Sequence, residues 1–204
     1  MAALAKQVGG HCTTTRYTDI HENRIMLPDV LSKGLTLVVC GTAASSESAA
    51  REHYYAGPGN KFWRTLHETR LTRRQLAPAE YREVLRDRIG LTDLIKGQSG
   101  GDAAISFAAE ARSVLHDKIL QYAPAYLCFN GKRAAKQYFG KSHVEYGWQR
   151  ERLGHTVFFV APSTSGAANA YWDLAMWRAL GVRVVRARRA GITTLAADKP
   201  TLRM

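Results

Sequence analysis

Residues 54–63, with the sequence Tyr-Tyr-Ala-Gly-Pro-Gly-Asn-Lys-Phe-Trp, combine side chains that could bind a flat ligand. Two aromatic rings precede a Gly/Pro turn, and an asparagine stands at the start of a predicted helix. Rings beside a tight turn suit a pocket in which a planar molecule stacks. A second polar loop, residues 161–166, has the sequence Ala-Pro-Ser-Thr-Ser-Gly and also follows a strand-like run. Two polar loops after two strands are what a site at the carboxyl ends of an open α/β sheet requires.

Short apolar runs rich in β-branched residues predict the strands that position these loops. Buried strands are predicted at residues 35–40, 125–129 and 156–160, and a short strand or turn at 91–95. Helices are predicted at residues 60–69, 78–89, 108–122, 132–139 and 171–180. Because strands alternate with helices, we predict an α/β fold, with three α/β/α layers and a mostly parallel central sheet.

The chain divides into one large domain and two ends of different composition. Its 204 residues suffice for one α/β domain, which we place at residues 34–185. Residues 1–33 are polar and irregular, and we interpret them as an N-terminal extension. Residues 186–204 are interpreted as a basic C-terminal tail.

The charge of the chain favours a polyanionic partner. Lys and Arg number 29 against 17 Asp and Glu, which gives a formal charge of +12 at pH 7. Such an excess is typical of proteins that bind nucleic acid, although a basic surface without a partner accounts for it equally well.

Cysteine usage and the lack of long apolar runs predict a soluble protein. The three cysteines form no CxxC pair, and Cys40 and Cys128 lie in apolar runs that are typical of core thiols. No apolar stretch approaches the roughly 20 residues of a membrane span, and the N-terminus has no apolar secretory segment. We therefore expect a cytoplasmic monomer with no membrane partner, no metal site and no cofactor.

Four motifs in chain order resemble those of the uracil-DNA glycosylase superfamily. Residues 55–63 resemble the aromatic-Ala-x-Pro-x-Asn-x-Phe-Trp signature of its mismatch-specific uracil/thymine branch and its hypoxanthine branch. Residues 89–94 are similar to a Gly-x-Thr-x-Leu or Gly-x-x-Asp segment of both branches. Residues 129–132 are similar to the Phe-Asn-Gly-Lys of thymine glycosylases, and residues 162–165 to the Pro-Ser-Thr-Ser loop of the hypoxanthine branch.

Two alanines depart from the pattern of the mismatch-specific branch. Ala43 stands where that branch has the asparagine that positions a water, and Ala161 stands where its second loop begins with Asn. A methyl group can neither hold a water nor hydrogen-bond a base. Another residue must therefore act if the protein is an enzyme.

The resemblance implies a DNA repair glycosylase that flips a deaminated base out of DNA, excises it and leaves an abasic site. Uracil is the first expectation for that base, so uracil-containing DNA would be the partner and free uracil the product. The alternatives are excision of hypoxanthine or mispaired thymine, or a binding protein with little catalysis that recognises uracil or abasic sites.

Base-binding residues follow from the same resemblance. Tyr55 matches the stacking aromatic of the mismatch-specific branch, but a tyrosine in the core is the alternative. Asn130 could pair with the N3–H and O4 of uracil, because an amide offers both a donor and an acceptor; it could also turn the chain and cap the next helix. Gly41 and Thr42 would flank the base in the first loop.

Asn60 is the main candidate for the missing catalytic group, since the hypoxanthine branch has a catalytic asparagine at the matching place. Its alternative is the N-cap of the following helix. Ser45 and Glu47 could position or activate a water, although a solvated helix accounts for them as well. Asp93 is another possible acid, or a residue that fixes a turn.

DNA contacts are expected from the second loop and from the helix after Asn130. The hydroxyls and N–H groups of Ser163, Thr164 and Ser165 suit phosphate oxygens. Lys132 and Arg133 could line a phosphate track or form a solvated basic face. The four residues after this loop, Gly-Ala-Ala-Asn, include no bulky wedge, which leaves room for a preference for single-stranded or easily opened DNA.

Overall fold

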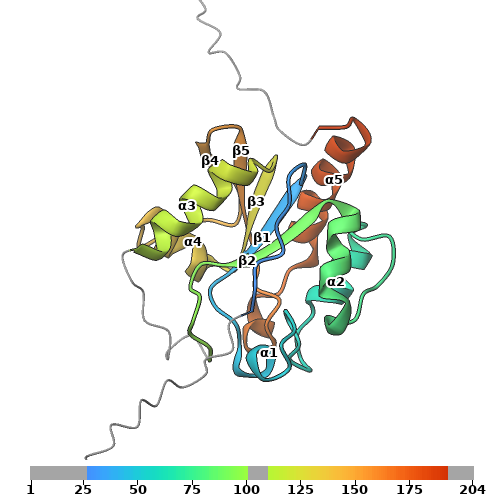
Figure 1. Ribbon diagram of the computed structural model, residues 1–204, viewed down its shortest axis with the longest axis vertical. Coiled ribbons are helices and arrows are strands. Elements are labelled where there is room, and N and C mark those ends of the chain that lie inside the picture. Colours follow the sequence, from blue (N-terminus) through green and yellow to red (C-terminus); the bar gives the residue numbers. More distant parts are fainter. Residues whose placement is uncertain (1–26, 101–109, 193–204) are drawn as a thin grey trace, which may run out of the picture.

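A five-stranded sheet forms the centre of the protein in the computed structural model, which describes residues 27–100 and 110–192 (Figure 1). The strand order is β2-β1-β3-β5-β4. Four strands are parallel: β1 (Leu37–Gly41), β2 (Ile89–Asp93), β3 (Tyr126–Asn130) and β5 (Thr156–Ala161). The edge strand β4 (Gly147–Leu153) runs antiparallel to β5. The predicted α/β class with a mostly parallel sheet is confirmed.

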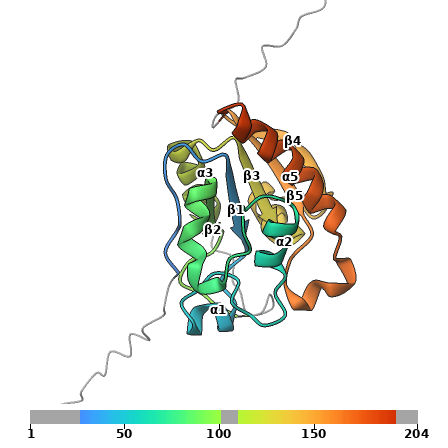
Figure 2. The same ribbon diagram turned by 90° about the vertical axis from the view of Figure 1, so that its right-hand side faces the viewer.

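Helices cover both faces of the sheet, as the two views show (Figures 1 and 2). The α-helices are α1 (Ser46–Ala50), α2 (Phe62–Glu68), α3 (Glu110–Tyr122), α4 (Lys132–Phe139) and α5 (Leu174–Arg189). Two 3₁₀ segments, η1 (Pro78–Asp87) and η3 (Gly166–Tyr171), complete the list for the described residues.

Alternate residues of each buried strand face opposite layers. Val39 packs with α2, η1 and α5 on one face, whereas Val38 and Cys40 pack with α3 and α4 on the other. This alternation follows from the two-residue period of a strand. Because all five residues of β1 are buried, its sequence must be apolar or small throughout.

Three elements differ from the sequence expectation. β4 was not predicted, because its sequence Gly-Trp-Gln-Arg-Glu-Arg-Leu is polar; an edge strand can expose such side chains. The segment predicted as a helix at 78–89 is 3₁₀ with a break at Glu80. Helix α5 continues past Leu180 to Arg189, since Val184 and Ala187 are buried against the core.

The expected ends of the domain are only partly described. In the N-terminal extension, Leu27 and Val30 are buried, and Val30 bridges to Leu91 of β2. Residues 186–189 of the expected tail belong to α5. Residues 1–26 and 193–204 lie outside the described residues, so the domain division itself stays a prediction. Within the described ranges, no helix is both long and apolar enough to span a bilayer.

Gly181 allows α5 to approach the end of α2. A Cβ atom at Gly181 would lie 2.5 Å from the backbone oxygen of Thr69, which cannot easily move. We expect Gly181→Ala to lower the free energy of unfolding by about 1–3 kcal/mol through overpacking, despite the better helix propensity of alanine. Urea unfolding measures this change. Gly57→Ala is the matched control, since its Cβ would meet nothing within 4 Å; equal losses in both variants would contradict the packing argument.

Candidate functional site

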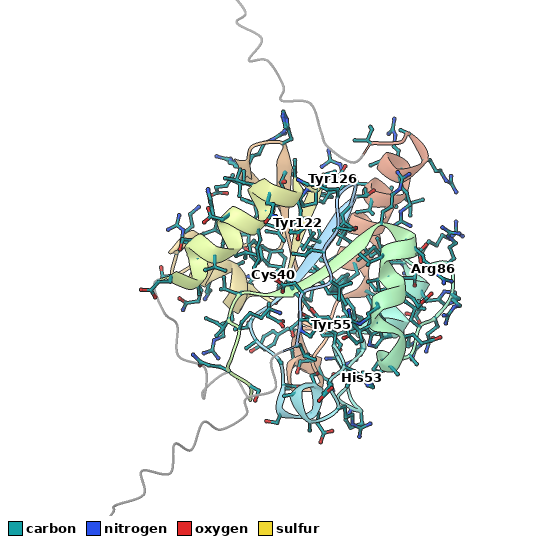
Figure 3. All side chains as sticks on the ribbon, viewed as in Figure 1. Cys40, His53, Tyr55, Arg86, Tyr122 and Tyr126 are labelled. Atoms are coloured by element: carbon teal, nitrogen blue, oxygen red, sulfur yellow. The ribbon has the colours of Figure 1, made fainter. Side chains whose placement is uncertain are left out.

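The candidate site lies where the parallel strands end. Gly41, the last residue of β1, pairs in register with Asp93, the last residue of β2. Asn130 ends β3 beside Ala161 of β5. Figure 3 shows Tyr55 near this end of the sheet, whereas Tyr126, the first residue of β3, lies near the other end. The fold therefore brings residues from three strand ends and one loop to the same edge.

Gly41 leaves room for two polar groups above the end of β1. A Cβ atom at this position would lie 2.6 Å from Oδ1 of Asp93 and 3.5 Å from the hydroxyl oxygen of Tyr55. The carboxyl group and the phenol therefore occupy the space that any larger residue at position 41 would fill. Sequence analysis named Gly41 as a base-binding residue, and its contacts identify the groups that it accommodates.

Tyr55 offers one ring face and one hydroxyl group to the site. Its ring stacks on Phe62 with a centroid separation of 3.7 Å and an interplanar angle of 28°, so only the opposite face could accept a ligand. Within the described residues, its buried hydroxyl has no hydrogen-bond partner. Burial raises the pKa of Tyr55 well above its ordinary value; the negative charge of Asp93 adds to the shift, and the nearby amide of Asn130 opposes it. The phenol is therefore neutral, and its hydroxyl group lies beside the Asn130 amide.

Asp93 is 5% exposed, and burial raises the pKa of its carboxyl group. The Lys96 ammonium opposes this shift from 3.4 Å away. Lys96 also donates to the hydroxyl of Tyr54 at 2.7 Å and lies 2.9 Å from Asp29. Asp29 in turn pairs with Lys118 at 2.6 Å. Sequence analysis named Asp93 only as an option and missed Lys96, because no motif or spacing marks that lysine.

Asn130 joins the end of β3 to the second loop. Its Nδ2 donates to Oγ1 of Thr164 at 2.9 Å, and its Oδ1 accepts from the backbone N–H of Thr164 at 3.0 Å. Gly131 follows with a φ of 112°, and a Cβ there would lie 3.2 Å from Cβ of Ser163. Asn130 thus positions a loop, and its amide also lies beside the hydroxyl group of Tyr55.

The second loop differs from expectation at one of its three hydroxyl residues. Thr164 is fully buried and its hydroxyl accepts the bond from Asn130, so its side chain cannot reach a phosphate. This corrects the expected DNA contact through the Thr164 side chain. Ser163 is half-buried and Ser165 is exposed, so both remain accessible.

The aromatic loop and the second loop are in direct contact. The backbone N–H of Lys61 donates to the carbonyl of Thr164 at 2.9 Å. Gly59 and Gly166 pack closely enough that a Cβ on Gly166 would lie 3.3 Å from the carbonyl oxygen of Gly59. The position of the aromatic loop that carries Tyr55 is therefore coupled to the loop held by Asn130.

The three residues predicted as catalytic each have a structural contact. The side chain of Asn60 accepts a hydrogen bond from the N–H of Phe62 at 3.0 Å, so it forms an Asx turn directly before α2, whose N-cap residue is Lys61. Ser45 caps α1 through a bond from the N–H of Ser48 at 3.1 Å. Glu47 is exposed and pairs with Arg51 on α1 at 3.2 Å. Of the three, Asn60 is half-buried and stands in the same loop as Tyr55.

The first loop is bonded through its carbonyl groups. The carbonyls of Gly41 and Thr42 accept from the backbone of Leu94 and Ile95 at 2.9 and 2.8 Å. Ala43 is partly buried against the core beneath α3 and α4. The methyl group at position 43 therefore makes an apolar contact.

Two basic residues begin α4, as predicted. Lys132 and Arg133 are both half-buried. The Lys132 ammonium lies 4.3 Å from the ring centroid of Tyr146 and 3.6 Å from a carboxylate oxygen of Glu145. Lys132 is thus oriented by an aromatic ring and only partly neutralised.

A pocket of about 230 Å³ lies elsewhere, near the beginning of β2. It is lined by Arg73, Arg74, Leu76, Glu83, Arg86 and Asp87. Its arginines are paired with acids: Arg73 with Asp87, Arg74 with Glu80, and Arg86 with Glu83. These ion pairs explain why charged side chains line this pocket, so the pocket is interpreted as structural.

No metal centre is found in the part of the chain that the structure describes, since no group of three or more His, Cys, Asp or Glu residues could hold an ion there. Cys40 and Cys128 are buried and unpaired, and burial raises the pKa of both thiols. Both cysteines are therefore core residues. The third, Cys12, lies outside the described residues.

Comparison with known proteins connects this geometry to a family. A family model described as the uracil DNA glycosylase superfamily matches residues 28–181, which is more than half of the chain. The fold is similar to the solution NMR structure of a protein from Methanosarcina acetivorans that is provisionally named a uracil DNA glycosylase. The TM-score is 0.51 and the sequence identity 22%, with 79% of this chain and 98% of that chain covered. At this identity, the structural likeness supports the shared fold.

The Asn130–Thr164 pair predicts a cost when its hydroxyl is removed. Thr164→Val keeps the shape of the side chain but leaves the Nδ2 of Asn130 without its acceptor. An unsatisfied buried donor costs about 1–3 kcal/mol, so we expect a loss of this size in urea unfolding. Thr164→Ser retains the hydroxyl, so its free energy of unfolding should fall much less. A fall as large as that of the valine variant would contradict the role of the hydrogen bond.

The Asp93 carboxyl predicts a dependence of stability on pH. Because burial raises its pKa, the folded protein binds more protons than the unfolded chain between the ordinary carboxyl pKa and the raised value. The contribution of Asp93 to the free energy of unfolding therefore falls as pH rises through this window. Asp93→Asn should remove that fall, which urea unfolding of both proteins across the window would measure.

Asp29 acts in a different pH range. Burial alone would raise its pKa, but Lys96 and Lys118 hold the pKa below the ordinary value. Its stabilisation is thus present above the ordinary carboxyl pKa and lost as pH falls below it. The prediction for Asp93 is tested above the ordinary carboxyl pKa. If the free energies of unfolding of wild type and Asp93→Asn changed equally with pH there, Asp93 would have no raised pKa.

Proposed function

The chain belongs to the uracil DNA glycosylase superfamily, a family of DNA glycosylases, and from this membership we propose that it excises uracil from DNA and leaves an abasic site. One observation carries the proposal: the phenol of Tyr55 lies beside both the buried carboxyl group of Asp93 above Gly41 and the carboxamide of Asn130 at the strand ends. Such a set can stack a planar base and hydrogen-bond its edge.

The flipped base would stack on the free face of Tyr55. Base–aromatic stacking is worth about 1–3 kcal/mol in proteins that bind single strands. Phe62 supports the Tyr55 ring from behind, so the ring is held in place before the base arrives. Gly41 and Thr42 would border the base, and the amide of Asn130 would pair with its edge.

Bond cleavage would be assisted by fixed donors around the departing base. As the C1′–N bond breaks, its electron pair moves onto the base, and preorganised donors stabilise that charge. The Tyr55 hydroxyl and the Asn130 amide are suitable donors, and the Lys96 ammonium neutralises Asp93 nearby. A water then adds to C1′ and loses one proton, and the released base gains one.

Asn60 is the proposed holder of that water. Its Oδ1 already accepts from Phe62, which fixes the orientation of the amide, and its NH₂ group has no partner among the described residues. Ser45 and Glu47 remain weaker proposals, since α1 accounts for their contacts. For the DNA backbone, Ser163, Ser165 and the basic start of α4 are the proposed phosphate contacts.

A binding protein with the same fold is the second candidate. Ala43 and Ala161 support it, because both are buried or partly buried methyl groups at positions where the mismatch-specific branch has polar side chains. Such a protein would bind uracil or abasic DNA without releasing the base. Hypoxanthine and mispaired thymine are the alternative substrates.

Release of uracil from a defined oligonucleotide tests the function. We expect wild type to release uracil, and Asn130→Ala and Asn60→Ala to be slower by about 10²-fold, the usual cost of one transition-state donor. Inosine, xanthine, thymine-mismatch and uracil oligonucleotides in parallel identify the preferred base. Tight binding without release by wild type would instead support the binding protein.

Matched variants separate chemistry from positioning. Asn60→Ser keeps an oxygen that can accept from the N–H of Phe62 but removes the amide, so it should be as slow as Asn60→Ala. Thr164→Val loosens the loop yet keeps the Asn130 amide, so it should be faster than Asn130→Ala. Glu47→Gln tests the weaker proposal: release at the wild-type rate would remove Glu47 from the mechanism and leave it with its exposed pair with Arg51. Full activity in both alanine variants would reject the assigned roles.

A further inference from the structure

Tyr171 is an exposed aromatic residue at the same end of the sheet as the candidate site. It ends η3, the segment that follows the second loop, and 73% of its surface is exposed. In Figure 1, η3 lies in orange at the end of the molecule where the parallel strands finish. An exposed tyrosine ring at a binding site offers a face on which a ligand can pack.

Two aromatic–lysine pairs neighbour Tyr171. In the first, which contains the next residue of the chain, the Lys61 ammonium lies 5.5 Å from the ring centroid of Trp172 and is hydrogen-bonded to Asn169. In the second, the Lys132 ammonium lies 4.3 Å from the ring centroid of Tyr146. We call these five residues, Lys61, Trp172, Tyr171, Tyr146 and Lys132, the aromatic–lysine strip.

Chain order and contacts connect the members of the strip. Trp172 follows Tyr171 and contacts Lys61, while burial and, after it, Tyr171 raise the pKa of Tyr146, the partner of Lys132. Glu145 contacts Lys132 at 3.6 Å and His143 at 2.6 Å, and Asp173, the residue after Trp172, caps α5. The Lys61 ammonium is hydrogen-bonded to the neutral amide of Asn169, so this contact leaves its positive charge available to a phosphate.

The strip connects to the candidate site through the loops. Lys61 belongs to the aromatic loop that carries Tyr55, and its N–H is bonded to Thr164. Lys132 begins α4, two residues after Asn130. A strand whose flipped base enters the site would therefore carry its neighbouring nucleotide across the strip.

Aromatic side chains between cations are the features that bind single-stranded nucleic acid. Bases stack on the rings, and the cations attract the phosphates. A paired base in a duplex is already stacked on its neighbours and offers no free face. The strip therefore fits an unpaired nucleotide better than a base pair.

We propose that the aromatic–lysine strip is a second nucleotide subsite, in which Tyr171 stacks an unpaired base next to the flipped nucleotide. The subsite rests on the proposed function for its place beside a flipped base, and it gives the protein a preference for single-stranded DNA. The ring supplies stacking, and the two lysines supply contacts to the flanking phosphates.

Binding of a fluorescent, uracil-free single-stranded oligonucleotide, measured by anisotropy, tests the subsite. We expect Tyr171→Ala to raise the Kd by about 5- to 150-fold, the range given by loss of one stacked base, and Tyr171→Phe to keep it near wild type. Val182→Ala is the matched control, since Val182 is 70% exposed but lies on α5, and it should not change the Kd. The duplex of the same sequence should bind more weakly and respond less to Tyr171→Ala.

The outcomes separate this subsite from the proposed function. An unchanged Kd in Tyr171→Ala overturns the subsite, even if wild type releases uracil, and is the result expected of an exposed tyrosine that serves a protein partner. An equal loss of affinity in Tyr171→Ala and Tyr171→Phe also overturns it. A selective loss in Tyr171→Ala supports the subsite, even if wild type releases no uracil. A duplex that binds as tightly as the single strand overturns the strand preference.

Discussion

The pair of hydrogen bonds between Asn130 and Thr164 is the constraint on which the rest of the site depends. One amide, fixed at the end of β3, satisfies both the backbone N–H and the hydroxyl of a buried threonine. The carbonyl of that threonine then holds the N–H of Lys61, at the beginning of α2. The loop that carries Tyr55 is therefore linked to the end of β3 through Thr164. The pair can be buried because each of its two hydrogen bonds joins a buried donor to a buried acceptor.

Gly41 has a comparable role at the end of β1. It contributes no side chain, and its value lies in the space that it leaves for Asp93 and for the hydroxyl of Tyr55. A buried carboxyl group is costly unless a cation is near, and Lys96 supplies that cation. Lys96 is in turn held by Asp29 from the N-terminal segment. This segment, expected to be an N-terminal extension, thus contributes through Asp29 to the charge balance of the site.

The sequence predicted the parts of this fold that depend on local patterns. The apolar runs around Val38, Cys128 and Phe159 located the central strands, and position after a strand marked Asn130 and the loop of Tyr55. The sequence could not predict β4, since its polar residues are compatible with an edge strand only once β5 is in place. Nor could it predict Lys96, because its contacts with Asp29 and Tyr54 join segments far apart in the chain. Burial of Thr164 and exposure of Tyr171 are likewise set by tertiary packing.

The charge of the Asp93–Lys96 pair decides whether this site can support bond cleavage. A base that departs with the bonding electrons carries negative charge, and a second negative charge about 4 Å away would cost about 4 kcal/mol at an effective dielectric constant of about 20. An unpaired carboxylate beside Gly41 would therefore oppose the reaction. The Lys96 ammonium at 3.4 Å offsets the charge of the Asp93 carboxylate, and burial, which raises the pKa of Asp93, favours the uncharged acid. In either state the departing base meets no uncompensated negative charge from Asp93. The buried carboxyl group is therefore compatible with bond cleavage at this edge of the sheet.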